Sequence, residues 1–347
     1  MPFTSANAML SHTQLEPIII DLDGSIVAQT DFTSRYSPRV FPARNHDAAL
    51  RYWATRDDLE EFGRAFVESM GPICGKAIFY GSSDTHNLTW VLLKLLDRPV
   101  SVIHFDAHND FSKMGIPDTS IGAGTWVGRA CELPNVKKVI QFGLDKDLGW
   151  VGGAPLPLGS YSHEINLLTS GQVDCYPNDC MSTTLVGEIE NSNPTVEMTS
   201  HMFMTDVKWI SFKGNGGAES VVTRALERVP TDDVYITIDK DALREQDSVT
   251  NYHGLLQGAM TLDDMATALR VIAKHKNIIA MDVCGDGSTP SSPAWSMKDL
   301  FRRVKDHNLE AEFFERPENI AINAISNLRI LEAVGVSSQR LETARAG

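Results

Sequence analysis

The sequence predicts an α/β protein of three layers, with a mostly parallel sheet between two layers of helices. Short apolar runs alternate with longer amphipathic stretches along the 347 residues,. This alternation is typical of βα units, whose stable arrangement is a parallel sheet covered by helices on both faces. Right-handed crossovers then place the C-terminal ends of the strands at one edge of the sheet.

The strands are predicted from short runs of β-branched and aromatic residues, such as PIIIDLDG at 17–24 and KAIFYGSS at 76–83,. Further runs of this kind lie at 101–108, 137–144, 206–212, 233–241 and 277–286. The helices are predicted from amphipathic stretches, such as DDLEEFGRAFVESM at 57–70, which begins with acidic residues that favour a helix N-terminus,. The other helices are expected at 87–96, 122–133, 219–229, 262–275 and 318–335.

We predict a single domain, residues 1–347, because the sequence contains no repeat and no Pro- or Ser-rich linker. Residues 1–16, roughly, are expected to be an N-terminal extension. Residues 145–205 are expected to be an irregular insertion, since they consist largely of loop-forming sequence,.

Composition restricts the class of protein. A net charge of −14 with no basic stripe argues against a nucleic-acid partner and is compatible with a cationic small substrate,. Five scattered cysteines without a C-x-x-C pair argue against a disulfide scaffold or a zinc ribbon,. The chain begins without a secretion-signal pattern and has no apolar run long enough for a membrane span,. A reduced, cytoplasmic protein is therefore expected.

Potential metal ligands follow three of the predicted strands. SVIHFDAHND (101–110) ends in Asp106, His108 and Asp110, at every second position, so that the three side chains point the same way while the strand lasts,. Asp239 and Asp241 end another strand, and His86 follows a third. Four carboxylates and two histidines at one sheet edge suit two divalent ions that share ligands. Mn²⁺ is the expected ion, and Zn²⁺, Fe²⁺ and Ni²⁺ are compatible with the same donors.

Three motifs in this order resemble the ureohydrolase (arginase/agmatinase) superfamily: GSSDTH (81–86), DAHND (106–110) and TIDKD (237–241). HGLLQGAMTLDDM (253–265) is similar to a further stretch of that family. The resemblance spans roughly residues 76–335 and implies an arginase-like fold and hydrolysis of a C–N bond in a guanidino or amidino compound. It also suggests a homo-oligomer.

Carried over residue by residue, the resemblance implies that Asp106 and Asp239 bridge two metal ions. His86 and Asp110 would complete the ligands of one ion, and His108 and Asp241 those of the other. Water activated by the ions would attack the planar carbon of the substrate. Asp110 would bind this nucleophile and pass its proton to the leaving nitrogen.

The substrate side departs from the family pattern. Gly285 stands where the family has a substrate-binding Glu, so we assign that role to the next acid, Asp286. Val127 replaces a proton-shuttling His, and Ser112 replaces an Asn that contacts the amino-acid end of arginine. These departures argue against arginine as substrate. Asp286→Asn is expected to abolish turnover and leave the metal content unchanged.

Other interpretations remain. IIIDLDGS (18–25) resembles the first motif of haloacid-dehalogenase-type phosphatases, with Asp21 as nucleophile and Asp23 as general acid, but this leaves residues 106–110 unexplained. The chain could also be a metal-binding protein of the same fold without catalysis. Asp84 is interpreted as a helix cap and His104 as a core residue. His253 is interpreted as an exposed loop residue.

Overall fold

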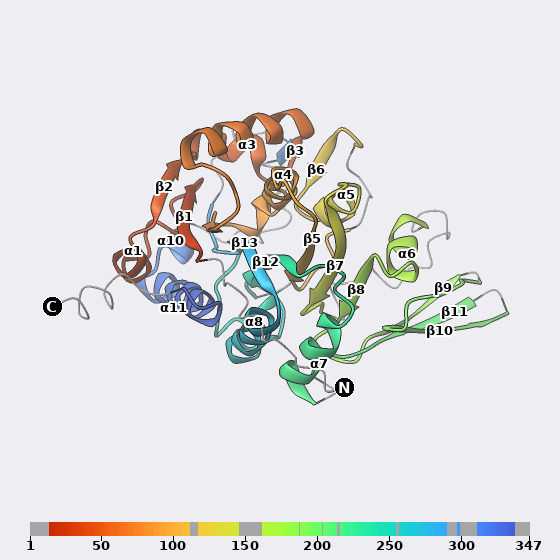
Figure 1. Cartoon of the computed structure of the whole chain (residues 1–347). Coiled ribbons are helices and arrows are strands. Elements are labelled where there is room, and N and C mark those ends of the chain that lie inside the picture. Colours follow the sequence, from red (N-terminus) through yellow and green to blue (C-terminus); the bar gives the residue numbers. More distant parts are fainter. Residues whose placement is uncertain are drawn as a thin grey trace, which may run out of the picture.

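The computed structural model describes residues 14–111, 117–145, 162–186, 188–202, 204–213, 216–254, 257–289, 297–298 and 311–336. Its centre is an eight-stranded sheet in which all the described pairings are parallel (Figure 1). The strand order is β2-β1-β4-β13-β12-β5-β7-β8. The bounds are β1 (Glu16–Asp21), β2 (Arg39–Pro42), β4 (Lys76–Phe79), β5 (Val100–Phe105), β7 (Val136–Phe142), β8 (Val173–Tyr176), β12 (Asp233–Asp239) and β13 (Asn277–Cys284).

Helices cover both faces of this sheet, so the predicted three-layer α/β/α architecture is confirmed (Figure 1). One face packs against α3 (Arg56–Met70), α4 (Leu88–Lys94) and α5 (Trp126–Ala130). The other face packs against α1 (Thr30–Tyr36), α7 (Gly217–Leu226), α8 (Leu262–His275) and α11 (Pro317–Ala333). Smaller elements are α2 (Asp47–Leu50), β3 (Trp53–Thr55), β6 (Ser120–Gly122) and α10 (Ala311–Phe314).

Local sequence explains where the amphipathic helices α3 and α8 begin. The side chains of Thr55 and Thr261 accept hydrogen bonds from the backbone N–H of Asp58 and Asp264, respectively. Each Thr thereby satisfies one of the N–H groups that have no partner within the helix, and the acidic first turns favour the helix dipole. The predicted starts of α3 and α8 therefore hold within one residue.

The region 145–205 differs from the irregular insertion that the sequence suggested. Its described part contains α6 (Ser162–Thr169), strand β8 of the main sheet, and strands β9 (Ser182–Val186) and β10 (Val196–His201). These last two flank β11 (Met204–Trp209) in a small antiparallel sheet. In β11 buried and exposed residues alternate, as in strands that face water on one side,.

Two further findings concern the N-terminal segment and the search for a membrane-spanning helix. The predicted N-terminal extension lies almost entirely outside the described residues, and Glu16 already begins β1. In the part of the chain that the structure describes, no helix combines the length and apolarity needed to cross a membrane.

Candidate metal centre

The six predicted metal ligands lie beyond the C-terminal ends of three strands near the middle of the sheet. Asp106, His108 and Asp110 follow β5, whereas Asp239 ends β12 and Asp241 lies in the 3-10 turn Lys240–Ala242. His86 comes directly after the 3-10 turn Ser83–Thr85, which follows β4. Because β12 pairs with β5 and β13 pairs with both β12 and β4, the sheet order brings these loops together.

Asp106 joins two groups of donor atoms. Its Oδ2 lies 3.3 Å from Nδ1 of His86, and its Oδ1 lies 3.4 Å from Nδ1 of His108. The His86 group also contains Asp110, with Oδ2 at 3.1 Å from Nδ1, and Asp239, with Oδ2 at 3.6 Å. The His108 group contains Asp241, whose Oδ2 lies 3.0 Å from Nδ1 of His108. The geometry is that of two adjacent sites with one shared carboxylate.

Two of these donor atoms are buried without a hydrogen-bond partner. They are Nδ1 of His86 and Oδ2 of Asp241. The opposite ring nitrogen of His86, Nε2, lies 3.0 Å from the hydroxyl of Thr237, which fixes the ring with Nδ1 directed at the carboxylates,. Buried polar groups normally form hydrogen bonds. Buried donor atoms that converge on one place without forming a hydrogen bond are what a cation site requires. The residues therefore fit divalent ions.

The electrostatics of the cluster support the same conclusion. Burial raises the pKa of Asp239 and of Asp241, and the neighbouring carboxylate charges raise both further,. Burial and the charge of Asp106 also raise the pKa of Asp110, to about 6. Burial acts in the same direction on Asp106, but the adjacent histidines His104, His108 and His86 outweigh it and hold its pKa well below the usual range. Four buried carboxylates repel one another, and bound cations would relieve that repulsion.

Asp110 is held in an unusual backbone conformation. Its φ of 52° lies in the left-handed region, which is uncommon for a residue other than Gly,. Its Oδ2 accepts a hydrogen bond of 2.8 Å from the indole N–H of Trp126, and its backbone carbonyl accepts one from Val127. Such strain persists only where the surrounding structure enforces it, and it concentrates at functional sites. Trp126, at the start of α5, was not identified from the sequence.

A cavity of about 180 Å³ opens over the two groups. Besides five of the candidate ligands it is lined by Ser83, Asn109, Ala123, Gly124 and Tyr252. The ring of Tyr252 lies 4.8 Å from that of His108, centroid to centroid. His253, by contrast, does not line this cavity, and its ring lies 5.2 Å from that of Phe313.

The structure does not bring Asp286 into this cavity. The Asp286 side chain is buried, and its Oδ1 accepts hydrogen bonds of 2.8 Å from Lys240 and 2.7 Å from Gln29. The preceding Gly285 has φ of 100°, and a Cβ there would lie 2.7 Å from Oδ1 of Asp239. The backbone therefore runs too close to the metal ligands for a side chain at 285. Ser112 lies outside the described residues.

Two sequence interpretations near the centre need correction. Asp84 does not cap the following helix: Ser82 caps the 3-10 turn, and Asp84 pairs with Arg51 at 3.3 Å. His104 is buried as expected, but its Nε2 lies 2.9 Å from Oδ2 of Asp106, so it belongs to the His86 group. The sequence signal for this contact was the position of His104 in β5, two residues before Asp106, since residues at i and i+2 share a face of a strand.

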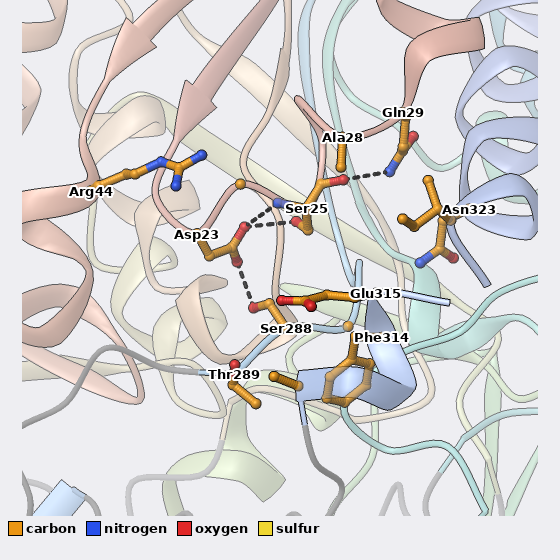
Figure 2. Close-up of a pocket in the computed structure, with 14 residues that line it drawn as sticks. Asp23, Ser25, Ala28, Gln29, Arg44, Ser288, Thr289, Phe314, Glu315 and Asn323 are labelled. Carbon is orange, nitrogen blue, oxygen red and sulfur yellow. Dashed lines mark hydrogen bonds between the residues drawn. The ribbon is translucent and has the colours of Figure 1, made fainter. Parts of the chain in front are cut away.

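The other acidic motif forms a different environment. A second cavity, of about 320 Å³, lies beside Asp23, Arg44 and Ser288 (Figure 2). The Asp23 carboxylate accepts hydrogen bonds from Ser25 and Ser288, and Asp21 pairs with Arg44 at 2.9 Å. Both oxygens of Asp23 and Oδ2 of Asp21 are therefore engaged by neighbours in this chain. This arrangement does not favour the phosphatase interpretation, in which Asp21 would be a free nucleophile.

Comparison with known proteins agrees with this geometry. The model of the arginase family matches residues 80–148, the segment that contains His86 and the Asp106–Asp110 triplet. The predicted resemblance to the ureohydrolase superfamily is confirmed over these residues. No curated protein matches the sequence of the chain.

Solved structures show the arginase-like fold over nearly the whole chain. Formimidoylglutamase from Bacillus subtilis has a TM-score of 0.54 at 13% identity, covering 94% of this chain and 89% of its own. A hypothetical agmatinase from Burkholderia thailandensis has a TM-score of 0.53 at 14% identity, covering 96% and 88%. Arginase from Bacillus subtilis has a TM-score of 0.53 at 13% identity, covering 92% and 98%.

Proposed function

We propose that this chain is a binuclear-metal hydrolase that cleaves a C–N bond of a small guanidino or amidino compound other than arginine. The observation that carries the proposal is the position of Asp106, whose two carboxylate oxygens face two different histidines, each with further acidic partners. A carboxylate placed in this way can bridge two ions.

The ligands divide between two sites. His86, Asp110 and Asp239 would hold one ion with Asp106, and His108 and Asp241 would hold the other. Asp239 was also expected to bridge, but its Oδ1 accepts hydrogen bonds from Ser83 and from the backbone N–H of Asp241. Its bridging role stays a prediction. This donor set is rich in oxygen and suits Mn²⁺, with Zn²⁺, Fe²⁺ and Ni²⁺ also compatible.

Divalent ions, when bound by these residues, would supply Lewis-acid activation of a water molecule and of the carbon it attacks. The chain itself supplies proton transfer and orientation. Asp110, fixed by Trp126, is the group that holds the attacking water and carries its proton to the leaving nitrogen,. Tyr252 and Asn109 offer neutral hydrogen-bonding groups at the wall of the cavity,.

The cavity argues for a small substrate. Its volume of about 180 Å³ is below the ~300 Å³ at which pockets for drug-sized ligands begin,. Its described carboxylates are all candidate metal ligands, so a guanidinium group would meet no separate acidic partner among the described lining residues. Recognition would then depend on the planar C–N group rather than on a long charged tail.

The assembly of this chain into a homo-oligomer also stays a prediction.

The decisive experiment combines elemental analysis with a substrate screen. Protein grown with added Mn²⁺ should contain about two ions per chain, and Asp106→Ala and Asp239→Ala should lose metal while remaining folded by circular dichroism. The loaded protein should release urea or ammonia from a panel of guanidino and amidino compounds. A folded, metal-free wild-type protein would refute the proposal.

A second candidate, a metal-binding protein of this fold without catalysis, has one specific observation in its favour. Asp286, the acid assigned to substrate binding, is buried in an ion pair with Lys240 and does not line the cavity. Two ions per chain together with no product from the full panel would favour this candidate.

A further inference from the structure

We propose that Cys284 is an additional ligand of the ion held by His86, so that this site prefers a softer metal than the site of His108. The inference rests on the proposed binuclear centre and adds a specificity-determining residue to it. A nitrogen of His86, a carboxylate oxygen of Asp239 and Sγ of Cys284 all lie within 4.8 Å of one another. All three side chains are buried.

The position of Cys284 in the sheet places its sulfur on the ligand side. Cys284 is the last residue of β13 and lies opposite Asp239 of β12 in the parallel register. Asp282, two residues earlier and thus on the same face of the strand, accepts a 2.8 Å hydrogen bond from Thr237,. Thr237 is the residue that holds Nε2 of His86. Cys284 therefore lies on the same face of the sheet as Asp282, two residues closer to the C-terminal edge at which the candidate metal ligands lie.

An independent observation indicates that this corner of the centre needs a cation. Nδ1 of His86 is buried and has no hydrogen-bond partner, and Nε2 is occupied by Thr237, so Nδ1 is the nitrogen left for coordination. The backbone also holds the sulfur in place, because Gly285 runs directly against Asp239 and Lys240. A metal between His86 and Asp239 would have the thiol within reach.

A sulfur ligand changes the choice of metal. A metal that takes up Sγ displaces the thiol proton to solvent, which leaves a thiolate–metal bond and no change of oxidation state. Thiolates favour Zn²⁺ and Co²⁺ over Mn²⁺, which prefers oxygen. The His108 group has only oxygen and nitrogen donors among the residues grouped with it. We therefore infer two unlike sites, of which the His86 site is the softer.

Cobalt spectroscopy tests this without an activity assay. The protein is loaded with Co²⁺, the bound metal is counted by elemental analysis, and the near-ultraviolet absorption is searched for a thiolate-to-cobalt charge-transfer band. Wild type should show the band. Cys284→Ala should lose this band. In competition experiments its preference for Zn²⁺ over Mn²⁺ should be about tenfold weaker than that of wild type. Cys175→Ala is the matched control, since Cys175 is equally buried on β8 but belongs to neither donor group, and it should keep the band.

The outcomes separate this inference from the proposed function. Bound Co²⁺ without a charge-transfer band in wild type, or a band that survives in Cys284→Ala, refutes sulfur ligation and leaves the binuclear centre standing. If wild type binds no Co²⁺, both proposals fail together. If Cys284→Ala does not fold, the spectrum of Cys284→Ser is compared with that of wild type, and this comparison still decides whether the sulfur binds the metal.

Discussion

Two buried charged clusters lie side by side at the C-terminal edge of this sheet, and they are built on opposite principles. In the first, Arg51 pairs with Asp47 at 2.9 Å, Asp84 at 3.3 Å and Asp23 at 3.4 Å. In the second, the candidate metal centre, Nδ1 of His86 and Oδ2 of Asp241 have no hydrogen-bond partner. In the Arg51 cluster one guanidinium pairs with all three carboxylates, whereas the metal centre contains buried donor atoms that form no hydrogen bond.

The difference shows how a structural cluster can be told from a binding site. Burial lowers the pKa of Arg51, but the three carboxylates outweigh this and raise it above the ordinary value, so the guanidinium stays charged. The same comparison separates Asp84 from the candidate metal ligands, although it is close to His86 in sequence: its Oδ2 pairs with Arg51 at 3.3 Å. A cluster that is complete without a ligand stabilises the fold, and an incomplete one predicts a ligand.

The largest effect on folding is therefore expected from Arg51→Met. This change removes the guanidinium that contacts the carboxylates of Asp23, Asp47 and Asp84 and should lower the free energy of unfolding by about 3–5 kcal/mol,. Denaturant unfolding measures the loss. Arg44→Met is the control, because the side chain of Arg44 is 62% exposed and its pair with Asp21 should contribute no more than about 1 kcal/mol,. Equal losses in the two variants would contradict the comparison.

A second effect concerns Asp286, whose Oδ1 forms a buried ion pair of 2.8 Å with Lys240. Asp286→Asn should lower the free energy of unfolding by about 3 kcal/mol, because it leaves the Lys240 ammonium buried without a counter-charge. Its metal content should remain that of wild type. Abolished turnover in a fully stable variant would instead restore the role in substrate binding that was assigned to Asp286 from the sequence.

The sequence predicted the centre better than its surroundings for a physical reason. Asp106, His108 and Asp110 follow a buried strand at alternate positions, so local chain geometry alone directs them to one place. Cys284 and Trp126 reach the centre through the pairing of β13 and the packing of α5, which no local pattern reveals. The Asp286–Lys240 pair was missed likewise, because it joins residues 46 positions apart in the sequence.

Metal removal should produce a smaller effect that is confined to the incomplete cluster. Ions that bind only the folded state at a concentration 100-fold above their dissociation constant stabilise it by about 2.7 kcal/mol. A chelator should therefore lower the melting temperature of wild-type protein and leave that of Asp106→Ala unchanged. Differential scanning calorimetry checks this. An equal response of the two proteins to the chelator would mean that Asp106 does not hold the metal.

The smallest effect is expected from Thr237→Val, which leaves every candidate ligand in place. The change removes the hydroxyl that holds Nε2 of His86 and that also donates to Asp282, and loss of such an orienting partner typically costs 10–100-fold in metal affinity,. Isothermal titration with Zn²⁺ measures this loss. Thr89→Val is the matched control: Thr89 also bonds Asp282, at 3.2 Å, but forms no hydrogen bond with His86 in the described structure, so the metal affinity of this variant should stay within about threefold of wild type,. If both variants lose affinity equally, the packing around Asp282 positions the centre, and the single bond from Thr237 to His86 does not.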